Sequence, residues 1–181
     1  NIPFVKFGGL KFLDSAHVKD MLALLRFAQN VRDRVAGFRI LQLLPGVGPA
    51  TAQTALDAVA DSAEPIATLS ALPCPPRAGA DWPGLVELLG ALRSGAAGWP
   101  GQIGQVRAWY EPHLERIHED APTRRADLLQ LEQIASGYAS RERFLTDLTL
   151  DPPDATSDEA GPPHLDEDYL ILSTIHSAKG Q

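Results

Sequence analysis

Apolar residues recur at helical spacing through most of the chain between residues 14 and 150. Asp14 or Ser15 can cap a first helix, and a broad apolar stripe then extends it to about Asn30. Similar patterns predict helices at about 35–44, 49–60, 66–72, 82–93, 102–119, 125–138 and 141–150, with Pro112 able to bend the helix at 102–119. The residues expected in the core are Val18, Met21, Leu22, Leu25, Phe27, Leu85, Leu88, Leu89, Leu92, Ile103, Val106, Tyr110, Leu114, Ile117, Leu128, Leu131, Ile134 and Ala135.

The two ends of the chain have a different pattern. Residues 2–7 (IPFVKF) predict a short strand, which Gly8 and Gly9 end as a turn. Residues 169–175 (YLILSTI) are nearly all apolar, as in a strand buried on both faces of a parallel sheet. The partner strands of this predicted strand must be largely missing. We therefore expect the chain to be a piece cut from a longer polypeptide. The predicted fold is mainly α, with two short terminal strands.

The segment 44–52 (LPGVGPATA after Leu43) predicts a tight turn between two helices. Gly46 and Gly48 flank the apolar Val47, and Pro49 stands where a helix can begin without its N–H. The free amides at the start of the second helix, together with its dipole, suit a phosphate. This is a helix-hairpin-helix pattern, which holds DNA without reading bases. The alternative is an ordinary helical hairpin whose glycines only end a helix.

Charge is distributed unevenly along the 181 residues. The net charge of −7 argues against general affinity for nucleic acid, but residues 1–50 carry +4, residues 51–150 carry −5 and residues 151–181 carry −6. Any phosphate-binding face should therefore lie in the first third. Residues 151–168 are rich in proline and acid and predict an extended linker, or an acidic tail with a binding role of its own. The single Cys74 and the absence of a 20-residue apolar run favour a cytoplasmic protein without a membrane partner.

Both ends also resemble a known family. Residues 2–13 (IPFVKFGGLKFL), followed by 17–20 (HVKD), resemble the segment after motif IV in superfamily I helicases of the UvrD/PcrA/Rep type, and residues 172–181 (LSTIHSAKGQ) resemble their motif V. Between these motifs the family inserts a helical accessory domain, called 2B, which carries a Gly-x-Gly hairpin. The resemblance implies motor-domain remnants at 1–13 and 169–181, a 2B-like domain at 14–150 and a linker at 151–168. Residues 56–150 carry no matching signature.

The resemblance implies which residues contact DNA. Gly46, Val47, Gly48 and Thr51 should meet duplex phosphates, and Lys19 and Arg26 match family positions that also touch the duplex. These two basic residues are seven apart, hence on one face of the predicted helix. Two departures from the family are His17, where Glu is usual, and Gln181, where Leu is more frequent. The residues implied in the single-strand contact at motif V are Thr174, His176, Ser177, Lys179 and Gly180.

The chain contains neither a Gly-x-x-x-x-Gly-Lys-Ser/Thr phosphate loop nor a Walker B pair of Asp and Glu. We therefore expect no catalytic residue, metal or cofactor in this fragment. The resemblance implies that the full-length protein uses ATP and Mg to move 3′→5′ and separate strands. The expected partners are duplex DNA, single-stranded DNA and the missing motor domains, with possible self-association through exposed strand edges.

Two other functions fit parts of the sequence. The hairpin also resembles that of helix-hairpin-helix DNA glycosylases, but the predicted second helix lacks a lysine and one cysteine cannot hold an iron–sulfur cluster. Asp57 and Asp61 are expected to face solvent. Alternatively, the acidic 51–150 region is a protein-interaction or autoinhibitory module.

Overall fold

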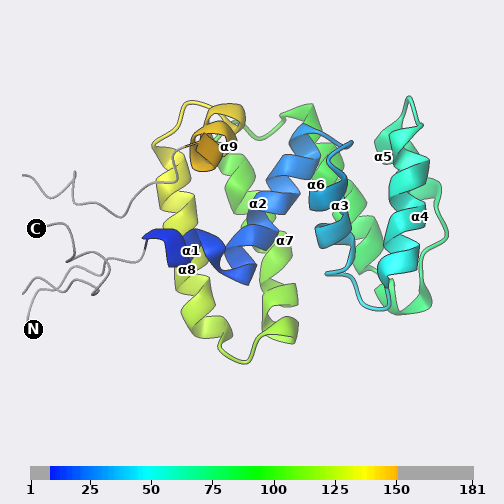
Figure 1. Ribbon diagram of the computed structural model, residues 1–181, viewed down its shortest axis with the longest axis horizontal. Coiled ribbons are helices and arrows are strands. Elements are labelled where there is room, and N and C mark those ends of the chain that lie inside the picture. Colours follow the sequence, from blue (N-terminus) through cyan, green and yellow to red (C-terminus); the bar gives the residue numbers. More distant parts are fainter. Residues whose placement is uncertain (1–8, 151–181) are drawn as a thin grey trace, which may run out of the picture.

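The computed structural model describes residues 9–150, and all regular structure within this range is helical (Figure 1). The prediction of a mainly α fold is confirmed for this range. The two predicted strands, the linker at 151–168 and Gly8 lie outside the described residues. The helices are α1 (Gly9–Asp14), α2 (Ala16–Gln29), α3 (Arg34–Leu41), α4 (Pro49–Ala60), α5 (Pro65–Ala71), the short 3-10 helix η1 (Pro76–Ala78), α6 (Asp81–Ser94), α7 (Gly101–Ile117), α8 (Ala121–Ser136) and α9 (Arg141–Leu150).

Helix α2 is the centre of the structure. It packs against α1, α3, α6, α7, α8 and α9, and a helix surrounded in this way needs an apolar surface around most of its circumference. The five core residues expected on α2 are all buried, but so are Leu24 and the polar His17 and Asp20. Asp20 is satisfied inside the core because Tyr110 Oη donates to Oδ2 at 2.6 Å and Arg39 Nε donates to Oδ1 at 2.5 Å.

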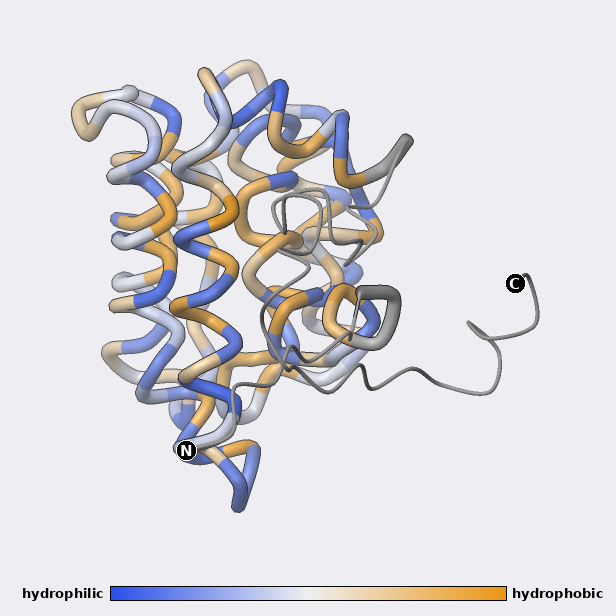
Figure 2. The backbone as a smooth tube through the Cα atoms, turned by 90° about the vertical axis from the view of Figure 1, so that its left-hand side faces the viewer, coloured by the Kyte–Doolittle hydropathy of each residue, from blue (hydrophilic) through white to orange (hydrophobic). Residues whose placement is uncertain are grey.

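Helices α3, α4 and α5 extend the structure to one side (Figure 1), and α4 packs against both α3 and α5. Asp33 caps α3 by accepting a hydrogen bond from the Ala36 amide at 3.0 Å. An ion pair between Arg34 and Asp57, 2.6 Å long, joins α3 to α4 on the surface. Along most helices apolar and polar residues alternate with the turn of the helix (Figure 2), so one face of each supplies the shared core.

Several predicted boundaries and buried positions are wrong. Gly9 does not end a strand in a turn but begins α1, whose Phe12 and Leu13 pack against the core. Helix α8 begins at Ala121 rather than near 125, with Pro122 in its first turn. Ile117, expected in the core, has 44 % of its surface exposed in the last turn of α7.

Other predictions differ less from the structure or agree with it. Ile134 is only partly buried. Pro112 lies inside α7, yet the helix continues through it to Ile117. The remaining core residues predicted on α6, α7 and α8 are buried. No helix within residues 9–150 is both long and apolar enough to cross a membrane.

Candidate nucleic-acid interface

The segment between α3 and α4 makes a sharp elbow, as the sequence predicts. Pro45 cannot donate a hydrogen bond that would prolong α3, and Gly46 adopts a φ of +77°, which L side chains rarely take. Val47 then inserts into the core, where only 6 % of it is exposed. Gly48 is extended (φ −89°, ψ 175°) and precedes Pro49, the first residue of α4. The residues therefore form the helix-elbow-helix unit expected of a hairpin motif.

The amides around the elbow divide into two groups. The Val47 amide donates to the Leu44 carbonyl at 3.2 Å and the Ala52 amide to the Gly48 carbonyl at 3.0 Å. The amides of Gly48, Ala50 and Thr51 make no hydrogen bond to the part of the chain that the structure describes, as is usual at the start of a helix. Gly48 is also unobstructed, since an added Cβ would meet nothing within 4 Å. The start of α4 thus offers open donors and the positive end of a helix dipole.

Four residues of the elbow were expected to meet phosphate, and the structure gives them different roles. Gly48 and half-buried Thr51 have amides that an anion can reach. Gly46 is exposed and shapes the turn. Val47 has a buried side chain and an amide already bonded within the hairpin, so neither is available to a ligand.

A basic residue that the sequence did not single out lies against the elbow. Arg77, in η1, is exposed, and its Cβ lies 2.9 Å from the place where a Cβ on Gly46 would be. The aliphatic stem of Arg77 therefore crosses Gly46, and within residues 9–150 its guanidinium has no ion pair. The proline-rich composition of residues 73–79 predicts a loop, but no local sequence pattern indicates that this loop folds back onto the elbow.

A second arginine, Arg116, contacts the backbone of the elbow. Arg116, near the end of α7, donates from Nη2 to the Leu43 carbonyl, and its Nη1 lies 3.3 Å from Asp81 Oδ2. Its Nη2 is also 2.9 Å from Nδ1 of the buried His113. Burial lowers the pKa of His113, and Arg116 adds to this effect while Asp81 opposes it. A neutral ring can accept the Arg116 hydrogen bond at Nδ1, so these groups are mutually compatible.

The structure does not bring Lys19 and Arg26 to the elbow. Both lie on the unbroken helix α2, and α3 lies between α2 and α4 (Figure 1). Lys19 Nζ forms an ion pair with Asp14 Oδ1 at 2.8 Å. A DNA duplex that contacts Lys19 and Arg26 would therefore use a second region of the surface.

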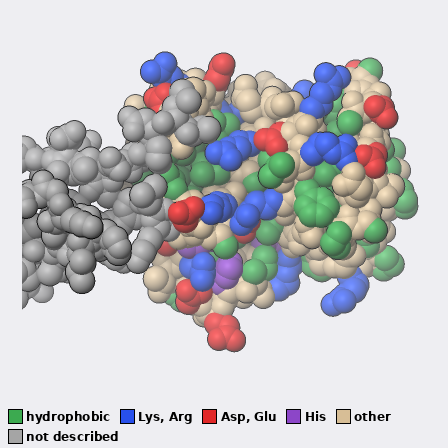
Figure 3. All heavy atoms as spheres, viewed as in Figure 1, with side chains coloured by type: hydrophobic (Ala, Val, Ile, Leu, Met, Phe, Trp, Pro, Cys, Tyr) green, Lys and Arg blue, Asp and Glu red, His purple; other side chains and the backbone are tan. Residues whose placement is uncertain are grey.

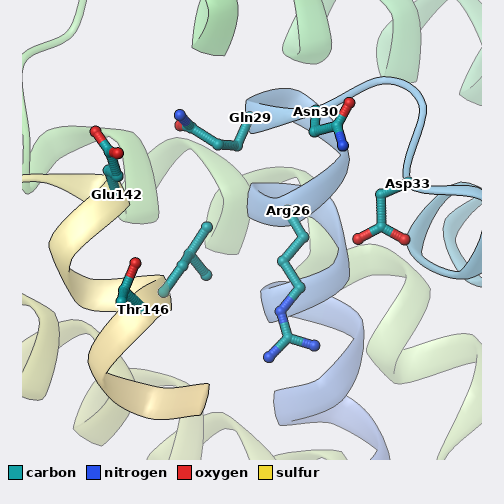
Figure 4. Close-up of a pocket in the computed structure, with 7 residues that line it drawn as sticks. Arg26, Gln29, Asn30, Asp33, Glu142 and Thr146 are labelled. Carbon is teal, nitrogen blue, oxygen red and sulfur yellow. The ribbon is translucent and has the colours of Figure 1, made fainter. Parts of the chain in front are cut away.

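Arg26 lines a groove of about 360 Å³ between α2 and α9 (Figure 4). The side chains that share this groove are Gln29, Asn30, Asp33, Glu142, Leu145 and Thr146. Two carboxylates, from Asp33 and Glu142, therefore accompany one guanidinium, a charge balance that disfavours a phosphate.

The single-strand site predicted at motif V consists of five residues. Thr174, His176, Ser177, Lys179 and Gly180 lie outside the described residues. On the face seen in Figure 3, Lys and Arg side chains are interspersed with Asp and Glu and do not form one basic patch.

No group of three or more His, Cys, Asp or Glu side chains in the 9–150 range is placed to hold a metal ion. Comparison with protein-family models, curated proteins and solved structures gives no match to this chain.

Proposed function

We propose that the helical region binds duplex DNA through the elbow between α3 and α4, as the accessory region of an ATP-dependent 3′→5′ helicase of the UvrD/PcrA/Rep type. The observation that carries this proposal is the open start of α4, where the amides of Gly48, Ala50 and Thr51 are unbonded within the described chain and Arg77 stands alongside. Backbone amides and one arginine can hold a phosphate without reading a base.

The helicase assignment rests on the resemblance at the two ends of the chain, and the elbow supplies only the DNA contact. ATP and Mg would bind to motor domains of the longer polypeptide, and single-stranded DNA would meet the motif V residues. DNA repair, replication and recombination are the processes in which such a helicase acts.

Binding by this fragment should be weak. The described face contains mixed charges, and the elbow adds few positive groups to it. We expect a Kd for duplex DNA weaker than about 1 µM at physiological salt, within the range of non-specific contacts. A sub-micromolar Kd under those conditions would contradict this estimate.

The glycosylase alternative gains no support from α4. Its sequence (PATAQTALDAVA) contains no lysine, and the Asp57 carboxylate is held by Arg34 at 2.6 Å and by Gln53 Nε2 at 3.3 Å. An aspartate engaged in this way on an exposed surface is poorly placed to attack a base-sugar bond.

The decisive test is Gly48→Asp. The site has room for a side chain and a backbone that any residue adopts, and aspartate is a favoured residue before a helix, so the fold should be retained. Its carboxylate would occupy the α4 amides and repel phosphate. We expect anisotropy of a fluorescein-labelled duplex to show at least a tenfold loss of affinity.

Gly98→Asp is the matched control, because Gly98 is exposed, has the same free space around its Cβ and lies between α6 and α7. It makes the same charge change and should leave affinity nearly unchanged. Arg77→Ala should reduce the slope of log K against log salt by about one, as expected when one phosphate contact is removed. Gly48→Asp that binds duplex as tightly as Gly98→Asp would overturn the proposed function.

A further inference from the structure

Arg116 joins the two segments that form the proposed phosphate site. One segment is the elbow, where Arg116 Nη2 donates to the carbonyl of Leu43, three residues before Gly46. The other is the Arg77 loop, which leads directly into α6. Arg116 Nη1 contacts Asp81, the first residue of α6, four residues after Arg77. The elbow and the Arg77 loop are far apart in sequence, and a single guanidinium holds both.

The geometry of this contact suits an arginine. Its planar fork presents several N–H groups in fixed directions, and here they reach a backbone carbonyl, a carboxylate and the Nδ1 of His113. His113 is itself buried, so it supports the guanidinium from the α7 side. A lysine could contact one of these acceptors as a point charge but could not span them.

We propose that Arg116 is a positioning residue for DNA binding: it fixes the elbow relative to the Arg77 loop, so that the α4 amides and the Arg77 guanidinium meet the same phosphate. This inference rests on the proposed function. Arg116 acts through Leu43 and Asp81 and does not touch the DNA, which distinguishes it from Arg77.

Arg116→Gln is the variant to test, with Arg107→Gln as the control. Arg107 also lies on α7, and its ion pairs are with Glu111 and Glu132 rather than with the elbow. Circular dichroism at the assay temperature confirms that each variant is folded. Duplex affinity is then measured over a salt series, together with amide hydrogen exchange across residues 41–52.

Arg116→Gln should lower duplex affinity about tenfold with an unchanged slope of log K against log salt, whereas Arg77→Ala reduces the slope by about one. Exchange at the Leu44 and Val47 amides, which donate within the turn, should be faster in Arg116→Gln and unchanged in Arg107→Gln. Adding Arg116→Gln to Arg77→Ala should cost less affinity than adding it to the natural chain, because the positioned group is already gone.

Three results would overturn the inference. The first is unchanged affinity in Arg116→Gln, and the second is exchange at the elbow that equals that of the control. The third is a salt slope reduced as in Arg77→Ala, which would make Arg116 itself a phosphate contact. If the natural chain does not bind duplex at all, the proposed function fails, and that outcome is recognised before any variant is compared.

Discussion

Gly46 is restricted to glycine by two features of the elbow. Its φ of +77° is strained for any L residue, and a Cβ there would lie 2.9 Å from Arg77 Cβ. Gly46→Ala should therefore lower the free energy of unfolding by at least about 1 kcal/mol. Gly48→Ala, at a site with ordinary φ and free space, should change it little. Chemical denaturation of the two variants checks this, and equal losses would contradict the assigned geometry.

At the scale of single residues, local pattern gave part of the candidate interface. The need for a glycine turn and the burial of Val47 follow from the apolar and glycine spacing around residues 44–48. Arg77 and Arg116 could not be found in this way, because each reaches the elbow through tertiary packing of a distant segment. No periodicity in a single chain encodes which arginine will lie under a carbonyl of another element.

At the scale of elements, Gly37 sets how closely α3 approaches its neighbours. A Cβ on Gly37 would lie 2.5 Å from side-chain atoms of both Phe27 and Leu56, which are buried and cannot easily move. Gly37→Ala should therefore destabilise the fold by about 1–3 kcal/mol through overpacking. Thermal or chemical unfolding measures the loss.

Gly90→Ala is the comparison within another helix. Gly90 lies inside α6, and its Cβ would come no closer than 3.9 Å to Ile66. Alanine there should stabilise the protein by roughly 0.5–1 kcal/mol, since glycine weakens a helix interior. Two glycine-to-alanine changes in helices should thus have opposite effects on stability, and a loss of stability in Gly90→Ala would contradict the free space between Gly90 and Ile66.

The bounds of a helix could be predicted where its apolar stripe was long. The prediction was wrong where contacts with other helices, and not the local pattern, determined the bounds or the buried positions. Helices α2, α4 and α6 have strong periodicity or clear start signals, and their bounds differ little from those expected. In the first turn of α8 Ala121 is buried, but Pro122, Thr123 and Arg124 are not core residues, so the apolar periodicity placed the start of the helix too late. Ile117 fits the stripe of α7, but the packing of residues 9–150 leaves 44 % of its surface exposed.

At the scale of the whole molecule, buried polar groups join helices that are far apart in sequence. His17 on α2 lies between two α8 residues: Arg124 Nη1 donates to its Nδ1 at 2.9 Å, and its Nε2 lies 2.9 Å from Asp127 Oδ2. These contacts assign the proton to Nε2 of a neutral ring. The sequence indicated that α2 is a core helix, but its polar partners on α3, α7 and α8 depend on tertiary packing and could not be predicted.

The two buried histidines, His17 and His113, make the free energy of unfolding depend on pH because both are neutral in the folded protein. Burial is the largest effect lowering the pKa of His17; Arg124 and His118 act in the same direction and Asp127 opposes them. His113 is lowered by burial and Arg116. In the unfolded chain both take up protons near pH 6.5. The unfolded state therefore binds more protons than the folded state below that pH, and stability should fall as pH drops from about 7 toward 5.

Glutamine at positions 17 and 113 should remove most of this dependence. Its amide can accept from Arg124 and donate to Asp127 in place of His17, but it does not titrate. Urea unfolding of the natural chain and of the double variant His17→Gln/His113→Gln, measured between pH 5 and 7.5, tests this directly. Each proton taken up on unfolding contributes at most about 1.4 kcal/mol per pH unit, so the two curves should run parallel above pH 7, and the natural chain should lose stability relative to the variant as the pH falls. Parallel curves over the whole range would mean that neither histidine is held neutral in the folded protein.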